Sequence, residues 1–226
     1  MIVFATAVSD SAVYEGVALR GIRRVAESDS RVLTRVGHDT IQRPYNEMMD
    51  EAAALPDLEA LVLLHQDLEL LDDSLPRRLR RAFRDPRVGL LGVLGGRLSK
   101  LHCWLSPDRA FGFAIGPNPR PLADPRISVG PHEVDGVDGA LIAAAPWVVR
   151  SVRFDEQGAG RFHGYDIDLG LRVKARGGTL ICEDVPCRHH TVLKGDFDAQ
   201  RDAGVELARK WDPAMRPREW AAAFQL

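Results

Sequence analysis

The sequence predicts an α/β fold with a mostly parallel central sheet and helices on both faces. Three observations support this prediction. Residues 2–8, "IVFATAV", form a continuous apolar run, which is typical of a strand that is covered on both faces. Segments with apolar residues at helical spacing alternate with further strand-like runs. This β-α-β-α-β-α-β order favours parallel strands joined by crossover helices. The predicted strands of the first half span residues 2–8, 31–37, 60–67 and 88–96.

Three helices are predicted between these strands. Ser11 or Asp10 is suited to cap the first of them, because short polar side chains accept backbone N–H bonds there. Pro56 stops the second helix, and Pro76 lies in the first turn of the third. The predicted helices span residues 12–27, 45–55 and 74–85.

The second half of the chain is less regular. Residues 104–136 contain six prolines and four glycines without a clear periodicity, and loops of that length in compact domains are usually functional or disordered. Regular elements then resume, and we expect one domain over 1–226 with a nucleotide-binding half at 1–96 and an acceptor and catalytic half at 97–226. The elements predicted there are a strand and helix start at 138–149, a turn and helix at 161–178, an extended segment at 179–192 and a helix at about 198–210.

Composition excludes several classes of protein. The net charge of −2 argues against a dedicated nucleic-acid binder, which usually has a basic excess. No apolar run approaches the roughly 18 residues that a membrane span needs, and the start of the sequence lacks the basic region of a signal peptide. Cys103, Cys182 and Cys187 show no C-x-x-C spacing, so we expect no zinc site, no disulfide framework and a cytoplasmic location.

Polar residues follow the third predicted strand in "LVLLHQDLEL", residues 61–70. His65 and Asp67 lie at its carboxyl end, and ligands of such sheets bind outside the carboxyl ends of the strands. A divalent cation beside a diphosphate needs only one or two protein ligands. Asp67 and one histidine of the late pair His189–His190 would suit it. Asp166, at the start of a predicted helix, would stay ionised in the positive potential of the helix N-terminus and is a candidate general base.

Four ordered blocks of the sequence resemble one known family. The blocks are "YNEMMDEAAALPDLEALVLLHQDLEL", "VGLLGVLGG", "VDGALIAAAPWVVRSVRFDE" and "FHGYDIDLGLRVKARGGTLICEDVPCRHH", and a later "ARKW" also fits. Together they resemble GT-A-fold glycosyltransferases of the family 2 type, close to a short bacterial group with an H-x-D metal motif. Residues 1–44 agree only in topology.

The resemblance implies a role for each matching residue. Asp67 would bind Mn²⁺ or Mg²⁺ together with His189 or His190, and Asp166 would be the catalytic base. His65 stands where the family usually has Asp, which removes a negative charge. The donor-binding residues expected on this basis are His65, Ala7, Val8, Ser9, Asp10, His38, Asp39 and Asn46. The acceptor-binding residues expected are Trp104, Asp138, Gly139 and Tyr165.

The implied activity is metal-dependent, inverting transfer of a sugar from a nucleotide-sugar donor to a hydroxyl of a carbohydrate or lipid-linked acceptor. The chain lacks the Gln-x-x-Arg-Trp motif of processive synthases. Residues 97–136 are expected to close over the donor and exclude water. Two other classes stay open: a nucleotidyltransferase, although no Gly-rich loop follows the first strand, and a non-catalytic nucleotide- or glycan-binding relative.

Simpler interpretations of the same residues also stay open. Asp67 could cap the next turn, and Asp166 could be only a helix N-cap. Asp168 is expected to be structural or to contact a hydroxyl. The arginines of the third predicted helix surround an apolar stripe, which is typical of a solvated helix face; peripheral contact with an anionic membrane is the alternative. The arginines concerned are Arg77, Arg78, Arg80, Arg81 and Arg84.

Overall fold

The computed structural model describes residues 1–96, 110–112, 130–158, 162–190 and 197–212. Trp104 and most of the segment 97–136, which we expected to close over the donor, lie outside the described residues.

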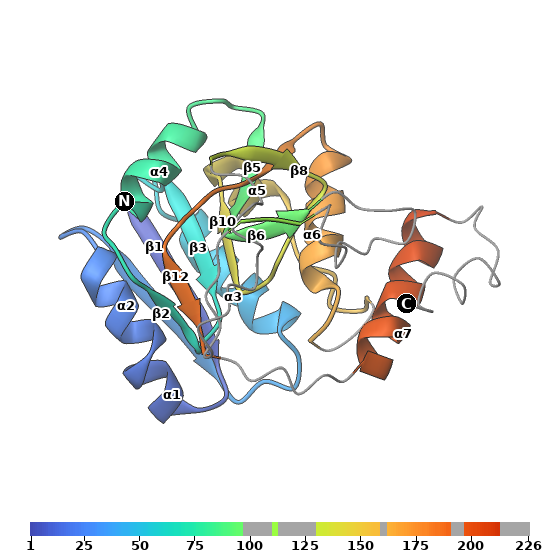
Figure 1. The fold of residues 1–226 in the computed structure, drawn as a ribbon, viewed down its shortest axis with the longest axis horizontal. Coiled ribbons are helices and arrows are strands. Elements are labelled where there is room, and N and C mark those ends of the chain that lie inside the picture. Colours follow the sequence, from blue (N-terminus) through green and yellow to red (C-terminus); the bar gives the residue numbers. More distant parts are fainter. Residues whose placement is uncertain (97–109, 113–129, 159–161, 191–196, 213–226) are drawn as a thin grey trace.

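A seven-stranded sheet forms the centre of the molecule, in the order β2-β1-β3-β10-β5-β11-β8 (Figure 1). β1, β2 and β3 run parallel to one another, and β5 runs parallel to β11. β10 is antiparallel to both β3 and β5, so β3 and β5 run in the same direction. The strands β1, β2, β3, β5 and β11 therefore share one direction, whereas β10 and β8 run the other way. The prediction of a mostly parallel α/β sheet is confirmed. The strands are β1 (Ile2–Val8), β2 (Arg31–Val36), β3 (Ala60–Leu64), β5 (Val88–Gly92), β8 (His132–Val134), β10 (Leu141–Ala144) and β11 (Thr179–Cys182).

Helices cover both faces of the sheet. Residues of α1 (Ser11–Gly16), α2 (Ala18–Val25) and α4 (Leu75–Ala82) share one buried apolar cluster with the sheet. Residues of α3 (Gln42–Ala53), α5 (Pro146–Ser151) and α6 (Tyr165–Lys174) share the cluster on the other face. α7 (Phe197–Trp211) packs on α6 through Leu207 and Ile167. The continuous apolar strands are therefore buried on both sides, as their composition predicts.

Two small sheets extend the central one. β4 (Leu68–Leu70) pairs antiparallel with β12 (Cys187–His189), and β6 (Leu94–Gly96) pairs with β7 (Ala110–Gly112) and β9 (Gly136–Val137). The predicted strand 60–67 is therefore shorter than expected, whereas the predicted strand 88–96 and the predicted extended segment 179–192 are each divided. The first ends at Leu64, because residues 65–67 turn away from the central sheet to begin β4. Three polar residues are thus presented on a turn.

The predicted helix 12–27 is also divided, because it breaks at Val17 between α1 and α2. Asp10, rather than Ser11, caps α1: its carboxylate accepts the N–H groups of Ala12 at 2.9 Å and Val13 at 3.1 Å. In α2, a Cβ on Gly21 would lie 2.5 Å from the backbone nitrogen of Leu70, so α2 packs directly against the backbone of β4. None of the described helices has the length and apolar character needed to cross a membrane.

Candidate functional site

The turn 65–67 meets the loop after β1 at the carboxyl ends of the parallel strands. The side-chain oxygen of Gln66 accepts the backbone N–H groups of Ser9 at 2.8 Å and Asp10 at 2.9 Å. Its amide nitrogen donates to Ser9 Oγ at 2.9 Å. One glutamine therefore holds the two loops together, which fixes the turn that carries His65 and Asp67.

Among the described residues, His65, Asp67 and His189 form one group that could hold a metal ion, with one ligand atom of each within 4.8 Å of the others. His189 Nε2 lies 3.2 Å from Asp67 Oδ1, and the ring centroids of His65 and His189 are 5.5 Å apart. The antiparallel pairing of β12 with β4 brings the late histidine to the early turn. All three side chains are partly buried.

The two neighbouring histidines contact different carboxylates. His190 Nε2 lies 3.1 Å from Glu69 Oε2, and the other oxygen of Glu69 accepts from Arg20 at 2.8 Å. Glu69 is buried, so this contact ties the residue after β12 to β4. Within the described part of the chain, only His189 of the two predicted histidines joins the group with Asp67.

The donor set fits a divalent transition metal. Burial and the neighbouring His189 lower the pKa of His65, which favours the neutral imidazole that binds metals. Burial acts to lower the pKa of His189 as well, but the hydrogen bond to Asp67 and the negative charges of Asp67 and Asp138 together outweigh it and raise that pKa. Imidazole ligands suit divalent transition metals better than they suit Mg²⁺, which prefers oxygen.

Asp166 is the second residue of α6. Its Oδ2 accepts the backbone N–H of Gly139 at 2.9 Å. Burial and the nearby Asp138 raise the pKa of Asp166 to about 7, so the expectation that the helix N-terminus keeps this carboxyl ionised is wrong. The N-cap of α6 is Gly164, at φ 74°, so Asp166 is not the cap. A carboxyl with a pKa near the working pH is suited to accept a proton in catalysis.

Tyr165 connects α6 with the turn after β3. Its hydroxyl lies 2.7 Å from His65 Nε2, and its side chain is buried. A Cβ at position 139 would collide with this hydroxyl, so Gly139 is needed for the approach. The hydroxyl of Tyr165 already contacts His65 in this structure. The contact of Tyr165 with an acceptor stays a prediction.

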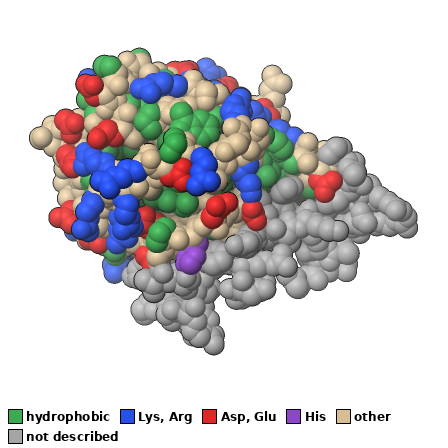
Figure 2. Space-filling view, turned by 90° about the horizontal axis from the view of Figure 1, so that it is seen from above, with side chains coloured by type: hydrophobic (Ala, Val, Ile, Leu, Met, Phe, Trp, Pro, Cys, Tyr) green, Lys and Arg blue, Asp and Glu red, His purple; other side chains and the backbone are tan. Residues whose placement is uncertain are grey.

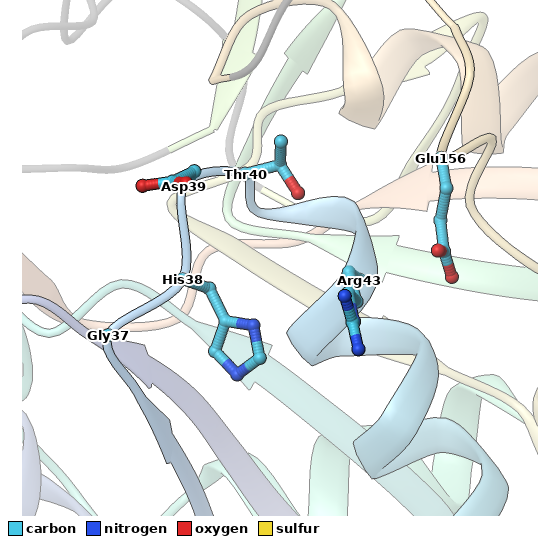
Figure 3. A pocket seen from close by; sticks show the side chains of 6 residues that line it. All are labelled: Gly37, His38, Asp39, Thr40, Arg43 and Glu156. Carbon is cyan, nitrogen blue, oxygen red and sulfur yellow. The ribbon is translucent and has the colours of Figure 1, made fainter.

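Two adjoining cavities open beside these groups. One of about 230 Å³ reaches the metal-binding group, and one of about 350 Å³ lies over the start of α3. Figure 3 shows the second cavity, with Asp39 pointing away from His38 and Arg43. The smaller cavity is lined by Ala7, Val8, Ser9, Arg35, His38, Thr40, Ile41, His65, Gln66, Asp67 and Phe162. The larger is lined by Gly37, His38, Asp39, Thr40, Arg43 and Glu156.

Most residues predicted to bind the donor line these cavities, but two do not. Asp10 caps α1. Asn46 is buried, and its amide accepts the N–H of Phe154 at 2.8 Å and donates to the Phe154 carbonyl at 3.0 Å and to Glu156 at 2.8 Å. Asn46 therefore holds Glu156 at the cavity, and its contact with a donor stays a prediction.

Sequence reasoning missed several lining residues, namely Arg35, Thr40, Arg43, Gln66, Glu156 and Phe162. Two signals were available. Gln66 lies inside the H-x-D motif, and Glu156 ends the "FDE" of a matching block. The exposed ring of Phe162 had no comparable signal.

Asp168 is fully engaged on the other side of α6. Its carboxylate accepts from Arg172 Nε at 2.7 Å, Trp211 Nε1 at 2.8 Å and Lys210 Nζ at 2.6 Å. Asp155 binds the same Arg172 and Lys210 at 2.7 and 2.6 Å. These contacts join α6 to α7 and agree with the structural role expected of Asp168.

The arginines of α4 are mostly paired with carboxylates. Arg80 binds Glu27 and Glu59, and both Arg78 and Arg81 bind the buried Glu183. Figure 2 shows the same mixture of basic and acidic side chains on the face that it views. This pairing favours a structural, solvated face for α4, and membrane contact stays untested.

One family model matches most of the chain, and solved structures show a similar fold. Residues 3–205 match the model described as "Glycosyltransferase like family". The streptomycin biosynthesis protein StrF of Streptomyces griseus is 28% identical over 204 residues, which cover 89% of this chain and 70% of that protein. The mannosyltransferase PcManGT of Pyrobaculum calidifontis, solved with GDP-Man and Mn²⁺, aligns at a TM-score of 0.58 with 12% identity, covering 99% of this chain and 67% of that one. GalNAc-T7, solved with UDP, GalNAc and Mn²⁺, aligns at 0.59 with 9% identity, covering 86% of this chain and 44% of that one. These structures share the fold, and the predicted GT-A architecture is confirmed.

Proposed function

Because this chain belongs to the glycosyltransferase-like family whose model it matches over residues 3–205, we propose that it transfers a sugar from a nucleotide-sugar donor to an acceptor hydroxyl, with inversion and with a divalent cation. The observation that carries the proposal is the meeting of two kinds of group at one edge of the sheet. His65, Asp67 and His189 can hold a cation, and Asp166, with its raised pKa, follows directly after the tyrosine that contacts His65.

The cation would be held by Asp67, His189 and His65. When bound, it would neutralise negative charge on the donor diphosphate. Two imidazoles and one carboxylate favour Mn²⁺ over Mg²⁺. The solved structures of PcManGT and GalNAc-T7 were both obtained with Mn²⁺, which supports this preference.

The donor nucleotide is proposed to occupy the two cavities. Its diphosphate would lie toward Asp67, and its base would lie toward the loop that follows β2, where His38 and Asp39 line the space. GDP-Man and UDP in the two solved relatives support a nucleoside diphosphate as the donor's leaving part.

Asp166 is proposed as the base that removes the acceptor's proton. The hydroxyl oxygen then attacks the anomeric carbon from the face opposite the diphosphate. The bond from that carbon to the diphosphate oxygen breaks, the nucleoside diphosphate leaves with the electron pair, and the carbon is inverted. Asp138 and Gly139, which lie beside Asp166, are proposed to contact the acceptor. General-base assistance is worth about 10²–10⁴-fold in rate.

The test is the binding of nucleoside diphosphates, measured by calorimetry with and without Mn²⁺. We expect Mn²⁺ to strengthen binding to wild type and Asp67→Ala to abolish the strengthening, because Asp67 supplies the only carboxylate of the group. Asp73→Ala, at an exposed position before α4, is the matched control and should behave as wild type. Equal affinity with and without Mn²⁺ in wild type would contradict the metal assignment.

A donor panel tests the enzymatic part. Hydrolysis or transfer of at least one nucleotide sugar in the presence of Mn²⁺ is expected. Tight nucleotide binding without turnover of any donor would favour the non-catalytic alternative. Release of pyrophosphate from a nucleoside triphosphate and a sugar phosphate would favour a nucleotidyltransferase.

A further inference from the structure

The contact between Tyr165 and His65 decides which nitrogen of His65 is free. Nε2 lies 2.7 Å from the phenol oxygen, whereas Nδ1 has no hydrogen-bond partner among the described residues. A ring nitrogen that faces a phenol at this distance has no room for a metal ion. Nδ1 is therefore the nitrogen that His65 would use as a ligand in the group with Asp67 and His189, which needs one ring nitrogen of each histidine.

We propose that Tyr165 is a positioning residue that accepts the Nε2–H of His65 and so directs the Nδ1 lone pair to the cation site. The proposal rests on the proposed function, since it assumes that a cation binds there. Histidine ligands of metals generally donate their other N–H to a hydrogen-bond acceptor, which fixes both the tautomer and the ring orientation. The phenol oxygen of Tyr165 would be that acceptor.

The surrounding fold holds the phenol in place from three sides. The ring of Tyr165 packs against Phe154 with centroids 6.0 Å apart and against Tyr45 at 6.2 Å. Gly139 leaves the space that the hydroxyl occupies. Packing of this kind restricts the ring to one position, which a positioning role requires.

The contact has a consequence for the whole site. Tyr165 and Asp166 are consecutive residues in the first turn of α6, and His65 lies in the turn after β3. One turn of helix would thus set both the orientation of a cation ligand and the position of the base. The His65 of the H-x-D motif would serve as a third ligand in this arrangement.

Nitrogen NMR of the imidazole rings tests the proposal on the full chain, with Zn²⁺ as a diamagnetic probe. In wild type with Zn²⁺, His65 should keep its proton on Nε2 and bind the metal through Nδ1. In Tyr165→Phe the ring should lose this fixed tautomer. Calorimetry should show Mn²⁺ affinity about 10–100-fold weaker than that of wild type, the usual effect of removing such a partner.

Tyr45→Phe is the matched control. It removes a neighbouring buried phenol oxygen that has no hydrogen-bond partner among the described residues, and it leaves the Tyr165–His65 contact intact. Its Mn²⁺ affinity and its His65 spectrum should equal those of wild type.

Several results would overturn the proposal. Binding of Zn²⁺ through His65 Nε2, or an absence of His65 from the metal's ligands, would do so on wild type alone, even if Tyr165→Phe failed to fold. A folded Tyr165→Phe variant with unchanged Mn²⁺ affinity would also overturn it. In these cases the metal-dependent function would stand, whereas failure of wild type to bind either cation would reject that function as well.

Discussion

Two carboxylates on the first turn of α6 occupy opposite electrostatic surroundings. Asp168 faces α7, where Arg172, Lys210 and Trp211 all donate to it. Asp166 faces the loop before β10, where it accepts backbone N–H groups and lies near Asp138, another carboxylate. The two residues are of the same type and only two positions apart.

The difference shows that two carboxylates of one helix can have separate roles, one in stability and one in the proposed reaction. A carboxylate that accepts from several cationic side chains joins the elements that carry those side chains. A carboxylate without a cation, buried beside a second carboxylate, has a raised pKa and can exchange a proton near neutral pH. Asp168 therefore belongs to the scaffold, and Asp166 belongs to the proposed reaction.

The strongest test of the comparison is Asp166→Asn. Asparagine is nearly isosteric but cannot accept the proton, so we expect turnover to fall by about 10²–10⁴-fold while nucleotide binding is kept. Initial rates and calorimetry would measure the two effects. Near-normal transfer by this variant would move the base elsewhere, and Asp138 would be the next residue to test.

Asp168→Asn should show the opposite pattern. It removes the charge that Arg172 and Lys210 contact, and we expect the free energy of unfolding to fall by about 1–3 kcal/mol, the usual range for a lost hydrogen-bond partner of a charged group. Turnover per folded molecule should change far less than in Asp166→Asn. Chemical denaturation and rates measured side by side would check this, and a selective loss of turnover would show that the two carboxylates are not separated in function.

Some features of the fold and of the site could be predicted from the sequence, and others could not. The position of His65–Asp67 at the end of a strand followed from an apolar run that stops abruptly, which is a local signal. The insertion of β10 between β3 and β5 could not be predicted, because it pairs Leu141 with Leu64 across a long stretch of chain. The choice between His189 and His190 depended on the register of β12 with β4, which no local pattern sets.

The contacts of Tyr165 and Asp168 could not be predicted from the sequence either. Their partners, His65 and Trp211, are distant in sequence, and a helical segment with mixed charge gives no sign of which face they occupy. The place of Asp166 at a helix start and the resemblance to a known family both indicated this residue, whereas its raised pKa depends on burial and on the neighbouring Asp138, which no local pattern shows.

The pH dependence of stability sharpens the comparison further. The pKa of Asp166 is about 7 in the folded protein against an ordinary value of 3.8, so the folded state holds a proton that the unfolded chain releases. The resulting stabilisation is complete below a pH of about 4 and is lost as the pH rises through about 7, at up to about 1.4 kcal/mol per pH unit. Asp166→Asn has no such titration, so its free energy of unfolding relative to that of wild type should increase from pH 4 to pH 7.

Turnover of wild type should rise over the upper part of this pH range, as the base loses its proton. Denaturation curves at several pH values would measure the first effect, and a constant difference between variant and wild type would contradict the raised pKa.

The smallest expected effect comes from the two phenols behind this turn, which differ as the two carboxylates do. Tyr165 has a partner in His65, whereas the hydroxyl of Tyr45 is buried without one among the described residues. A buried hydroxyl without a hydrogen bond is unfavourable by about 1–3 kcal/mol, and a water that reaches it reduces this penalty. Tyr45→Phe keeps the ring that packs against Phe154 and Tyr165, so we expect the free energy of unfolding to rise by up to about 1 kcal/mol. Tyr165→Phe, which leaves His65 Nε2 without its partner, should lower it instead. Thermal and chemical denaturation of both variants would measure the two signs. A loss of stability in Tyr45→Phe would show that its hydroxyl is bonded in solution, and the contrast between the two tyrosines would then not hold.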